Sequence, residues 1–169
     1  MRKIVAGFAI STDGFIEGPN GEIDWILMDP EINFAELMQR YDTYLVGRIS
    51  YEKALQMGAA AFADNKTYVF SRTLEKVQEP YQLVKDDAQS FIGSVKQQEG
   101  KDIAVFGGAD LLTSLLQMGV VDEISLSVIP VLLGSGKPFI GMLKNRVQLQ
   151  FKDTKTYGNG TVILTYKVI

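Results

Sequence analysis

Short runs of apolar and β-forming residues recur along the chain, and polar or glycine-containing turns separate them. Five such runs are Ile4–Ile10, Thr43–Val46, Lys66–Phe70, Tyr81–Val84 and Ile103–Phe106. Each is predicted as a strand, and the unbroken apolar run Ile103–Phe106, which is too short for a helix, fits a strand buried on both faces. A longer apolar run, Ile124–Leu133, contains Pro130, which indicates a sheet edge, a bulge or the end of the strand.

Helical spacing of apolar residues occurs between these runs. Apolar side chains repeat at i, i+3, i+4 and i+7 beginning at Phe34, which predicts a helix from about Pro30 to Arg40. Asp29 is a suitable N-cap for this helix. Three further helices are predicted: Tyr51–Met57 with Ser50 as N-cap, a helix that follows Asp87 and stops at Gly100, and one that begins at Ala109 and ends at Gly119. The small residues Gly58–Ala61 are assigned to no element.

The C-terminal part of the chain predicts a β-hairpin. Val147–Tyr157 and Thr161–Ile169 flank Asn159-Gly160, a dipeptide typical of tight hairpin turns. Strands alternate with helices up to about residue 130, so the expected fold is α/β, with a mostly parallel central sheet, helices on both faces and an antiparallel C-terminal hairpin. No internal repeat or linker interrupts the 169 residues, and a single domain over 1–169 is expected.

The composition limits the chemistry that this chain can perform. It contains no histidine and no cysteine, which removes the usual general base, thiol nucleophiles, disulfides and cysteine-bound zinc. The formal net charge is −3 and no run of lysine and arginine occurs, which argues against binding to nucleic acid or a membrane surface. No apolar stretch reaches the length of a membrane span, and a cytoplasmic protein is expected. Chemistry must therefore come from carboxylates, tyrosine, lysine, serine, threonine or a bound cofactor.

Glycine follows two of the predicted strands near the start of a helix, as Gly47 and as the pair Gly107 and Gly108 before Ala109. Glycine lets the backbone turn sharply and lets another group approach closely. The first amides of a helix lack partners within the helix and attract anions. Because the carboxyl ends of strands form the ligand-binding edge of an open α/β sheet, both turns fit a phosphate cradle. The alternative is a pair of tight turns without a ligand.

Two arginines and two serines lie at the same predicted edge: Arg48, Ser50, Ser71 and Arg72. The rigid fork of an arginine matches a phosphate dianion, so the set predicts a site for a phosphate monoester such as the adenosine 2′-phosphate of NADP. For each arginine alone, a surface salt bridge is the alternative. Gly134–Lys137 does not complete a nucleotide-triphosphate loop, because Val131 and Pro138 stand where that motif needs glycine and serine or threonine.

Five segments together resemble the dihydrofolate-reductase-like superfamily, and most closely the riboflavin-biosynthesis reductase domain, which is the C-terminal domain of RibD-type proteins. The segments are Ala9–Gly14, Leu45–Glu52, Ser71-Arg72, Val105–Ala109 and Val121–Gly134. Each segment alone is a weak signal, but the set follows the family's order and extends over essentially the whole chain.

The resemblance implies a reductase that binds NADPH. In the family's pattern, Gly47, Arg48 and Ser50 take the position of the first phosphate turn, with Arg48 near the 2′-phosphate. The other implied cofactor-binding residues are Ser71 and Arg72 at the adenosine end, Gly107, Gly108 and Ala109 at the pyrophosphate, and Ala9 and Ile16 on the nicotinamide side.

The resemblance also suggests three residues for the catalytic end of the site. Trp25 stands where dihydrofolate reductases keep an active-site tryptophan, and a core aromatic is the alternative. Asp29 is closest in spacing to the acidic residue of the first helix in those enzymes, but it also fits a simple helix cap. Asp13 matches an aspartate in a Ser-x-Asp-Gly turn of the riboflavin reductases, and a turn-forming aspartate is equally natural there. No metal site is expected.

The expected function is that of a reductase that transfers hydride from NADPH to a small heterocyclic or ribosylaminopyrimidine substrate. A zinc-dependent deaminase unit is not encoded in this chain, because no histidine or cysteine could hold the metal. A non-catalytic NADP-binding module, a dihydrofolate reductase proper and a domain for another phosphorylated ligand remain as alternatives. The resemblance favours a homodimer, with the Ile124–Leu133 strand and the terminal hairpin as candidate contact elements.

Overall fold

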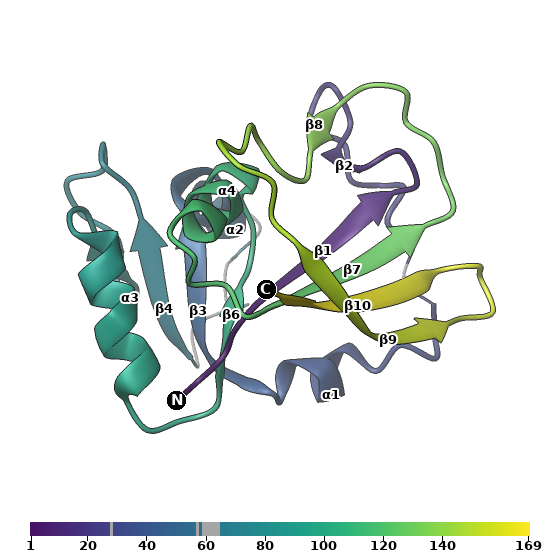
Figure 1. The fold of residues 1–169 in the computed structure, drawn as a ribbon. Coiled ribbons are helices and arrows are strands. Elements are labelled where there is room, and N and C mark those ends of the chain that lie inside the picture. The colour runs from purple at the N-terminus through teal and green to yellow at the C-terminus, as the bar shows by residue number, and fades with distance from the viewer. Residues whose placement is uncertain (28, 57, 59–64) are drawn as a thin grey trace.

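The computed structural model describes residues 1–27, 29–56, 58 and 65–169. Within these residues, eight strands form one sheet (Figure 1). Its order is β5 (Gln82–Val84), β4 (Lys66–Phe70), β3 (Tyr41–Gly47), β6 (Asp102–Val105), β1 (Ile4–Ser11), β7 (Glu123–Ile129), β10 (Val162–Val168) and β9 (Leu149–Thr156). A second, two-stranded sheet pairs β2 (Phe15–Glu17) with β8 (Lys137–Pro138).

The sheet is parallel from β5 to β7 and antiparallel at its C-terminal edge. β1 pairs in parallel with β6 and β7, β3 pairs in parallel with β6 and β4, and β4 does so with β5. β10 is antiparallel to both β7 and β9. This arrangement confirms the predicted mostly parallel sheet with an antiparallel C-terminal hairpin.

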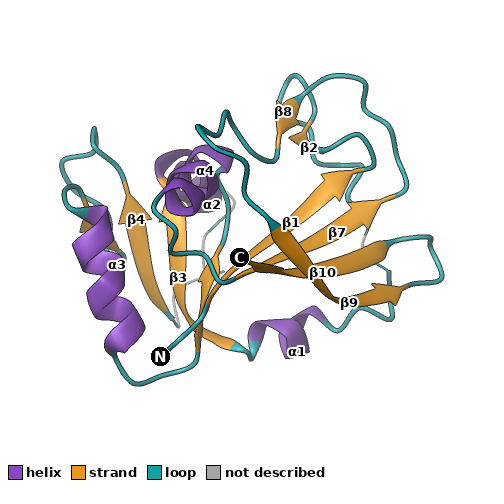
Figure 2. Ribbon diagram, viewed as in Figure 1, coloured by secondary structure: helices purple, strands orange, loops and turns teal. Residues whose placement is uncertain are grey.

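Helices cover both faces of the sheet, as predicted (Figure 2). The described helices are α1 (Phe34–Met38), α2 (Arg48–Gln56), α3 (Ala88–Gln97) and α4 (Ala109–Gln117). Residues of α3 and α4 share a buried apolar cluster with one face of the sheet, including Ile4, Leu45 and Ile103. Residues of α1 and α2 share a second cluster with the other face, around Tyr44 and Ala104.

The first helix is much shorter than the apolar spacing predicted. It spans only Phe34–Met38, and its N-cap is Asn33, whose side chain accepts a hydrogen bond from Glu36 N. Asp29 is therefore not the N-cap of this helix. The chain from Asp29 forms a turn instead, closed by a hydrogen bond from Ile32 N to Asp29 O.

Other predicted boundaries also change. Because α2 begins at Arg48, Ser50 lies inside its first turn and is not its N-cap. Met57 and residues 59–64, which include most of the stretch of small residues, lie outside the described part of the chain. β7 ends at Ile129, so Pro130 follows the strand, and the predicted Ile124–Leu133 strand was too long at its C-terminal end.

The connections at the C-terminal end fit their turn chemistry. The hairpin loop has three residues, Gly158–Gly160, because Tyr157 N donates to Thr161 O and Gly160 N donates to Tyr157 O. Gly160 has a φ of +85°, as this kind of loop requires. β7 is paired on both sides, by β1 and β10, and thus offers no free strand edge, whereas β9 lies at the edge of the sheet. No helix in the described residues is long and apolar enough to cross a membrane.

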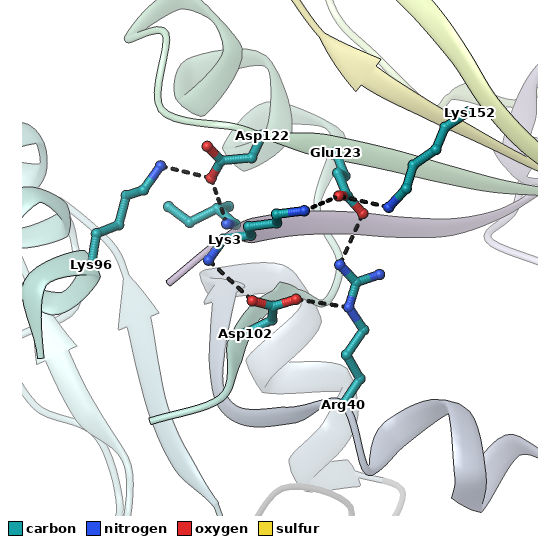
Figure 3. Close-up of polar contacts among 8 residues, drawn as sticks. Lys3, Arg40, Lys96, Asp102, Asp122, Glu123 and Lys152 are labelled. Atoms are coloured by element: carbon teal, nitrogen blue, oxygen red, sulfur yellow. Dashed lines mark hydrogen bonds and ion pairs between the residues drawn. The ribbon is translucent and has the colours of Figure 1, made fainter. Parts of the chain in front are cut away.

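A buried carboxylate joins several elements at the end of the sheet opposite the glycine turns (Figure 3). The Glu123 side chain is 3% exposed and accepts hydrogen bonds from Lys3 Nζ at 2.7 Å, Lys152 Nζ at 2.8 Å and Arg40 Nη2 at 2.8 Å. Arg40 also binds Asp102 at 2.8 Å. These ion pairs link β7, β9 and β6 to the residue before β1 and to the connection between α1 and β3.

The three cations keep this carboxylate ionised. Burial by itself would raise the pKa of Glu123, but the hydrogen bonds from Lys152, Lys3 and Arg40 outweigh it and lower the pKa from its usual 4.5 to about 2. A lowered pKa in the folded state stabilises the fold above the unfolded pKa, and this contribution disappears as the pH falls towards the folded value.

We expect Glu123→Gln to reduce the free energy of unfolding by about 3 kcal/mol, because it leaves three cations around a buried neutral group. Urea denaturation at neutral pH measures this loss. Glu99→Gln is the matched control, since it makes the same change at an exposed residue and should shift stability by less than about 0.5 kcal/mol. The difference between wild type and Glu123→Gln should shrink as the pH falls from 4.5 to about 2. A difference that stays constant over this range would contradict the assigned role.

Candidate nucleotide-binding site

Two glycine-bearing bends lie side by side at the carboxyl edge of the sheet. Gly47 ends β3, and Gly107 and Gly108 follow β6, the parallel neighbour of β3. Gly47 N lies 3.4 Å from Gly107 O and donates a hydrogen bond to it. Gly107 and Gly108 have φ values of +90° and +92°, which favour glycine. The structure thus confirms that the two turns predicted to cradle phosphate adjoin one another.

The path of the chain makes this junction a natural place for a ligand. From β3 the chain continues outward to β4 and β5, whereas from β6 it crosses β1 to reach β7. Neighbouring parallel strands whose connections leave in opposite directions mark the point where open α/β sheets bind ligands. α2 and α4 begin directly at the two bends, so the amino ends of both helices lie at this junction.

Ser50 lies against the second bend. A Cβ added to Gly107 would stand 2.7 Å from Ser50 Oγ and 3.1 Å from Ser50 Cβ. The first turn of α2 therefore contacts the Gly107 backbone closely, and a larger residue there would separate the two bends. The N-cap of α4 is Gly108, which makes no side-chain capping hydrogen bond. The amides at the start of α4 thus have no capping side chain.

A cavity of about 420 Å³ extends from this junction between α2, α3 and α4. It is lined by six of the predicted cofactor-binding residues, which are Gly47, Arg48, Ser50, Ser71, Arg72 and Gly108. Gly107 and Ala109 flank Gly108 in the chain but do not line the cavity themselves, and Ala109 is buried. The structure therefore brings together the phosphate-turn and adenosine-end residues that were predicted from separate segments.

Basic side chains dominate the charge of this cavity. Arg48, Arg72, Lys85 and Lys137 line it, together with one carboxylate, Asp110. Arg48 forms an ion pair with Glu52 at 2.9 Å, one helical turn along α2. Among the described residues, Arg72 and Lys85 make no ion pair. The cavity therefore offers unneutralised positive charge to an anionic ligand.

Lys85 was missed by the sequence reasoning, whereas Lys137 was weighed only within Gly134–Lys137 and was not chosen as a site residue. Lys85 directly follows β5, so the rule that selected residues after the carboxyl ends of strands would have found it. Lys137 lies in the segment that was compared with a triphosphate loop; it belongs to β8, which pairs with β2. Its place beside the cavity depends on this long-range pairing and has no local sequence signal.

Ser71 shapes the turn that carries Arg72. Its hydroxyl oxygen accepts hydrogen bonds from Thr73 N at 3.2 Å and Leu74 N at 3.0 Å. These bonds close the turn after β4 and fix the backbone on both sides of Arg72. The Ser71 hydroxyl therefore stabilises the turn after β4, and the positive charge at this turn comes from Arg72.

The residues predicted at the nicotinamide and catalytic end lie apart from this cavity. Ala9 is half-buried on β1, and Ile16 lies on β2 with part of its side chain against the first apolar cluster. Trp25 is half-buried, and its indole N–H donates to Glu22 O at 3.0 Å. None of the three lines the cavity.

Asp13 ties the turn after β1 to a distant segment. Its carboxylate accepts hydrogen bonds from Ser11 Oγ at 2.6 Å, Leu133 N at 3.1 Å and Gly134 N at 2.7 Å. The Ser11 hydroxyl and these amides lower the pKa of Asp13, against a smaller opposing effect of desolvation. A carboxylate held ionised in this way is a poor proton donor, and its contacts are those of a loop-positioning residue.

Asp29 is buried, with 6% of its surface exposed, and it holds the C-terminal hairpin. One carboxylate oxygen accepts from Glu31 N at 2.9 Å and the other from Asn159 N at 2.9 Å. Asn159 also donates through its side chain to Leu27 O. Both oxygens are therefore engaged by backbone amides. No group of three or more acidic, histidine or cysteine side chains within the described residues could hold a metal ion.

Comparison with known families agrees with this geometry. The model of the RibD C-terminal domain matches residues 2–163. The chain belongs to the RibD C-terminal domain family. One family relative, YyaP of Bacillus subtilis strain 168, is described as an uncharacterized protein and is 37% identical over 181 residues. The alignment covers 98% of this chain and 95% of YyaP.

Two solved structures share the fold. A Shewanella sp. PV-4 protein assigned to riboflavin biosynthesis superposes with a TM-score of 0.87 at 23% identity, over 99% of both chains. Dihydrofolate reductase from Enterococcus faecalis, solved with NADP(H), superposes with a TM-score of 0.73 at 17% identity, over 98% of this chain and 96% of that one. The family match and these likenesses confirm the dihydrofolate-reductase-like fold and the superfamily predicted from the ordered segments.

We expect Gly107→Ala to lower stability by about 2 kcal/mol, because it adds the strain of a positive φ to a close contact with Ser50. Gly119→Ala is the matched control: Gly119 also has a positive φ, +68°, but a Cβ there meets nothing within 4 Å, so about 1 kcal/mol is expected. Urea denaturation compares the two. Equal losses at the two positions would show that the contact between Gly107 and Ser50 is not tight.

Proposed function

We propose that this protein is an NADPH-dependent reductase. The observation that carries the proposal is the cavity that begins at two adjoining glycine bends and is lined by four basic side chains. Glycine at the bends leaves backbone amides accessible, and the basic residues supply the charge that a phosphorylated nucleotide needs. Membership of the RibD C-terminal domain family and the likeness to dihydrofolate reductase support the same reading.

The residues present fit this cofactor. In the proposal, the amides around Gly47 and Gly108 hold the pyrophosphate, since both residues line the cavity and stand at the two helix starts. Arg72 and Lys85 hold the adenosine 2′-phosphate, because both line the cavity beyond β4 and β5 and neither has an ion-pair partner among the described residues. Arg48 contributes from α2, where Glu52 orients it.

The reaction needs little chemistry from the protein itself. Bound NADPH would supply a hydride to the carbon of a C=N or C=O group and leave as NADP⁺, while a proton from water completes the reduction at nitrogen or oxygen. Asp13 and Asp29 position the turn after β1 and the hairpin tip, through the backbone amides that their carboxylates accept. The substrate we propose is a small heterocycle or a ribosylaminopyrimidine, as the family resemblance suggests.

We expect NADPH to raise the melting temperature more than NADH at equal concentration, because only NADPH carries the 2′-phosphate. Arg72→Ala and Lys85→Ala should each weaken NADPH binding about 10- to 100-fold, as expected for the loss of a charge-assisted hydrogen bond, with little change for NADH. Isothermal titration calorimetry measures both constants. Arg146→Ala removes the same charge from a segment outside the cavity and should change neither. If both variants keep the preference for NADPH, the placement of the 2′-phosphate is wrong.

Reductase activity is tested by following NADPH absorbance at the wavelength of the reduced nicotinamide. Dihydrofolate, dihydropterins and aminopyrimidine ribosides are the substrates to compare. We expect steady NADPH oxidation with at least one of them. Tight NADPH binding without oxidation in the presence of any of these compounds would contradict the reductase and favour a non-catalytic NADP-binding module.

A further inference from the structure

Lys137 is a half-buried cation in the wall of the cavity. It makes no ion pair with any residue that the structure describes. Arg48, which lines the same cavity, is paired with Glu52 and is thereby partly neutralised. An unpaired cation in a cavity wall attracts an anionic ligand. Lys137 is therefore available to a phosphate.

A tightly fastened segment carries Lys137 to the cavity. This segment is the connection between β7 and β9, residues 130–148, which we call the Lys137 strap. Near its start, the Asp13 carboxylate accepts hydrogen bonds from Leu133 N at 3.1 Å and Gly134 N at 2.7 Å. The turn after β1 thus holds the strap three residues before Lys137.

The backbone on both sides of Lys137 is also fixed. β8 pairs with β2 beside the end of β1, with Lys137 opposite Glu17 (Figure 1). Gly136 lies so close to this strand that an added Cβ would clash with Glu17 O. Phe139 N donates to Gly14 O at 3.1 Å. The position of Lys137 therefore depends on the turn after β1 and on β2.

The Lys137 strap then crosses α4 near its start. Gly141 N donates to Thr113 Oγ1 at 2.8 Å, and this hydroxyl donates in turn to Ala109 O at 2.7 Å. Ala109 is the first residue of α4, and Gly108 before it lines the cavity together with Lys137. The strap thus brings Lys137 to the cavity from the side of α4 and of the second glycine bend.

The other unpaired cations of the cavity lie on the opposite side of the bends. Arg72 comes after β4 and Lys85 after β5, which are the second and third strands outward from β6. Neighbouring strands are about 4.8 Å apart, so these strands lie about 10 and 14 Å from β6. The Lys137 strap arrives from β1, on the other side of β6. Cations therefore flank the bends on both sides.

Resting on the proposed function, we propose that Lys137 binds the pyrophosphate of the cofactor, at the phosphate nearer the nicotinamide, and that Asp13 is its positioning residue. With the 2′-phosphate at Arg72 and Lys85, the adenosine half extends outward to β4 and β5. The nicotinamide half then extends towards β1, the side from which Lys137 comes. Because NADPH and NADH share the pyrophosphate, Lys137 adds affinity for both, whereas Arg72 and Lys85 discriminate between them.

Three ligands that differ in their phosphates test the role of Lys137. Isothermal titration calorimetry on the full chain measures the dissociation constants of NADPH, NADH and adenosine 2′,5′-bisphosphate, which lacks the phosphate nearer the nicotinamide. We expect Lys137→Ala to weaken NADPH and NADH about tenfold each, as the loss of a charge-assisted hydrogen bond does. The bisphosphate should change by less than about twofold.

Two further variants serve as controls for the Lys137→Ala result. Lys137→Arg keeps the charge and should hold both dinucleotides within about threefold of wild type. Lys76→Ala removes a lysine that is exposed and lies outside the cavity, and it should change none of the three constants. A loss for NADPH alone would assign Lys137 to the 2′-phosphate. That loss, an equal loss for the bisphosphate, or no loss for either dinucleotide would overturn the proposal.

A double-mutant cycle tests the positioning role of Asp13. Asp13→Asn replaces an acceptor of two amides by a group that accepts through one oxygen only, so the strap loses a contact. We expect it to weaken NADPH about fivefold in the wild-type chain and less than about twofold when Lys137→Ala is already present. Equal losses in both backgrounds, or no loss in either, would show that Asp13 does not act through Lys137.

The wild-type protein separates this inference from the proposed function. If it binds neither NADPH nor NADH, the proposed function fails and the inference fails with it. If it binds NADPH and the Lys137→Ala variant binds both dinucleotides equally well, the inference alone is wrong, and the NADPH site at the glycine bends stands.

Discussion

The arrangement of the carboxyl edge of the sheet depends on the close approach of two backbone bends. Gly47 N reaches Gly107 O at 3.4 Å, and a Cβ added to Gly108 would lie 3.8 Å from Gly47 Cα. The left-handed backbone of Gly107 and Gly108 allows this contact at little cost. Because β3 and β6 are parallel neighbours, the two bends bring two helix starts to one place. The chain path alone thus places two helix starts together, without the glycine fingerprint of other dinucleotide folds.

Ion pairs stabilise the end of the sheet opposite the glycine bends. Lys3, Arg40 and Lys152 converge on Glu123 and fix strands that are far apart in the sequence. Since the pKa of Glu123 is about 2, this cluster stays intact over the whole neutral range. The carboxyl end can then carry glycine bends and loops that contribute less to stability. The separation of a rigid end from a ligand-binding end is common where loops on a scaffold carry function.

Local sequence patterns predicted most of the helices and strands. They failed where a contact with a residue far away in the sequence determines the structure. Lys66–Phe70 appears as β4 with the predicted bounds, because turn-forming residues flank it on both sides. The helical spacing that begins at Phe34 ends at Tyr41, which is the first residue of β3, so the pattern ran across an element boundary. Asp29 resembled a helix cap, but its partner is Asn159, 130 residues away. No local pattern could reveal that contact.

Gly7 shows the same limit on the central strand of the sheet. Within the apolar run Ile4–Ile10, a glycine looks only like a weak strand residue. Its meaning depends on what covers that face of the sheet. α1, on the side of the Tyr44 cluster, has five residues where the spacing predicted a helix from Pro30 to Arg40. Cations line the cavity between α2, α3 and α4, whereas Gly7, Ser125 and Ser127 lie on the other face of the sheet and carry no charge, a division that only the register of the strands reveals.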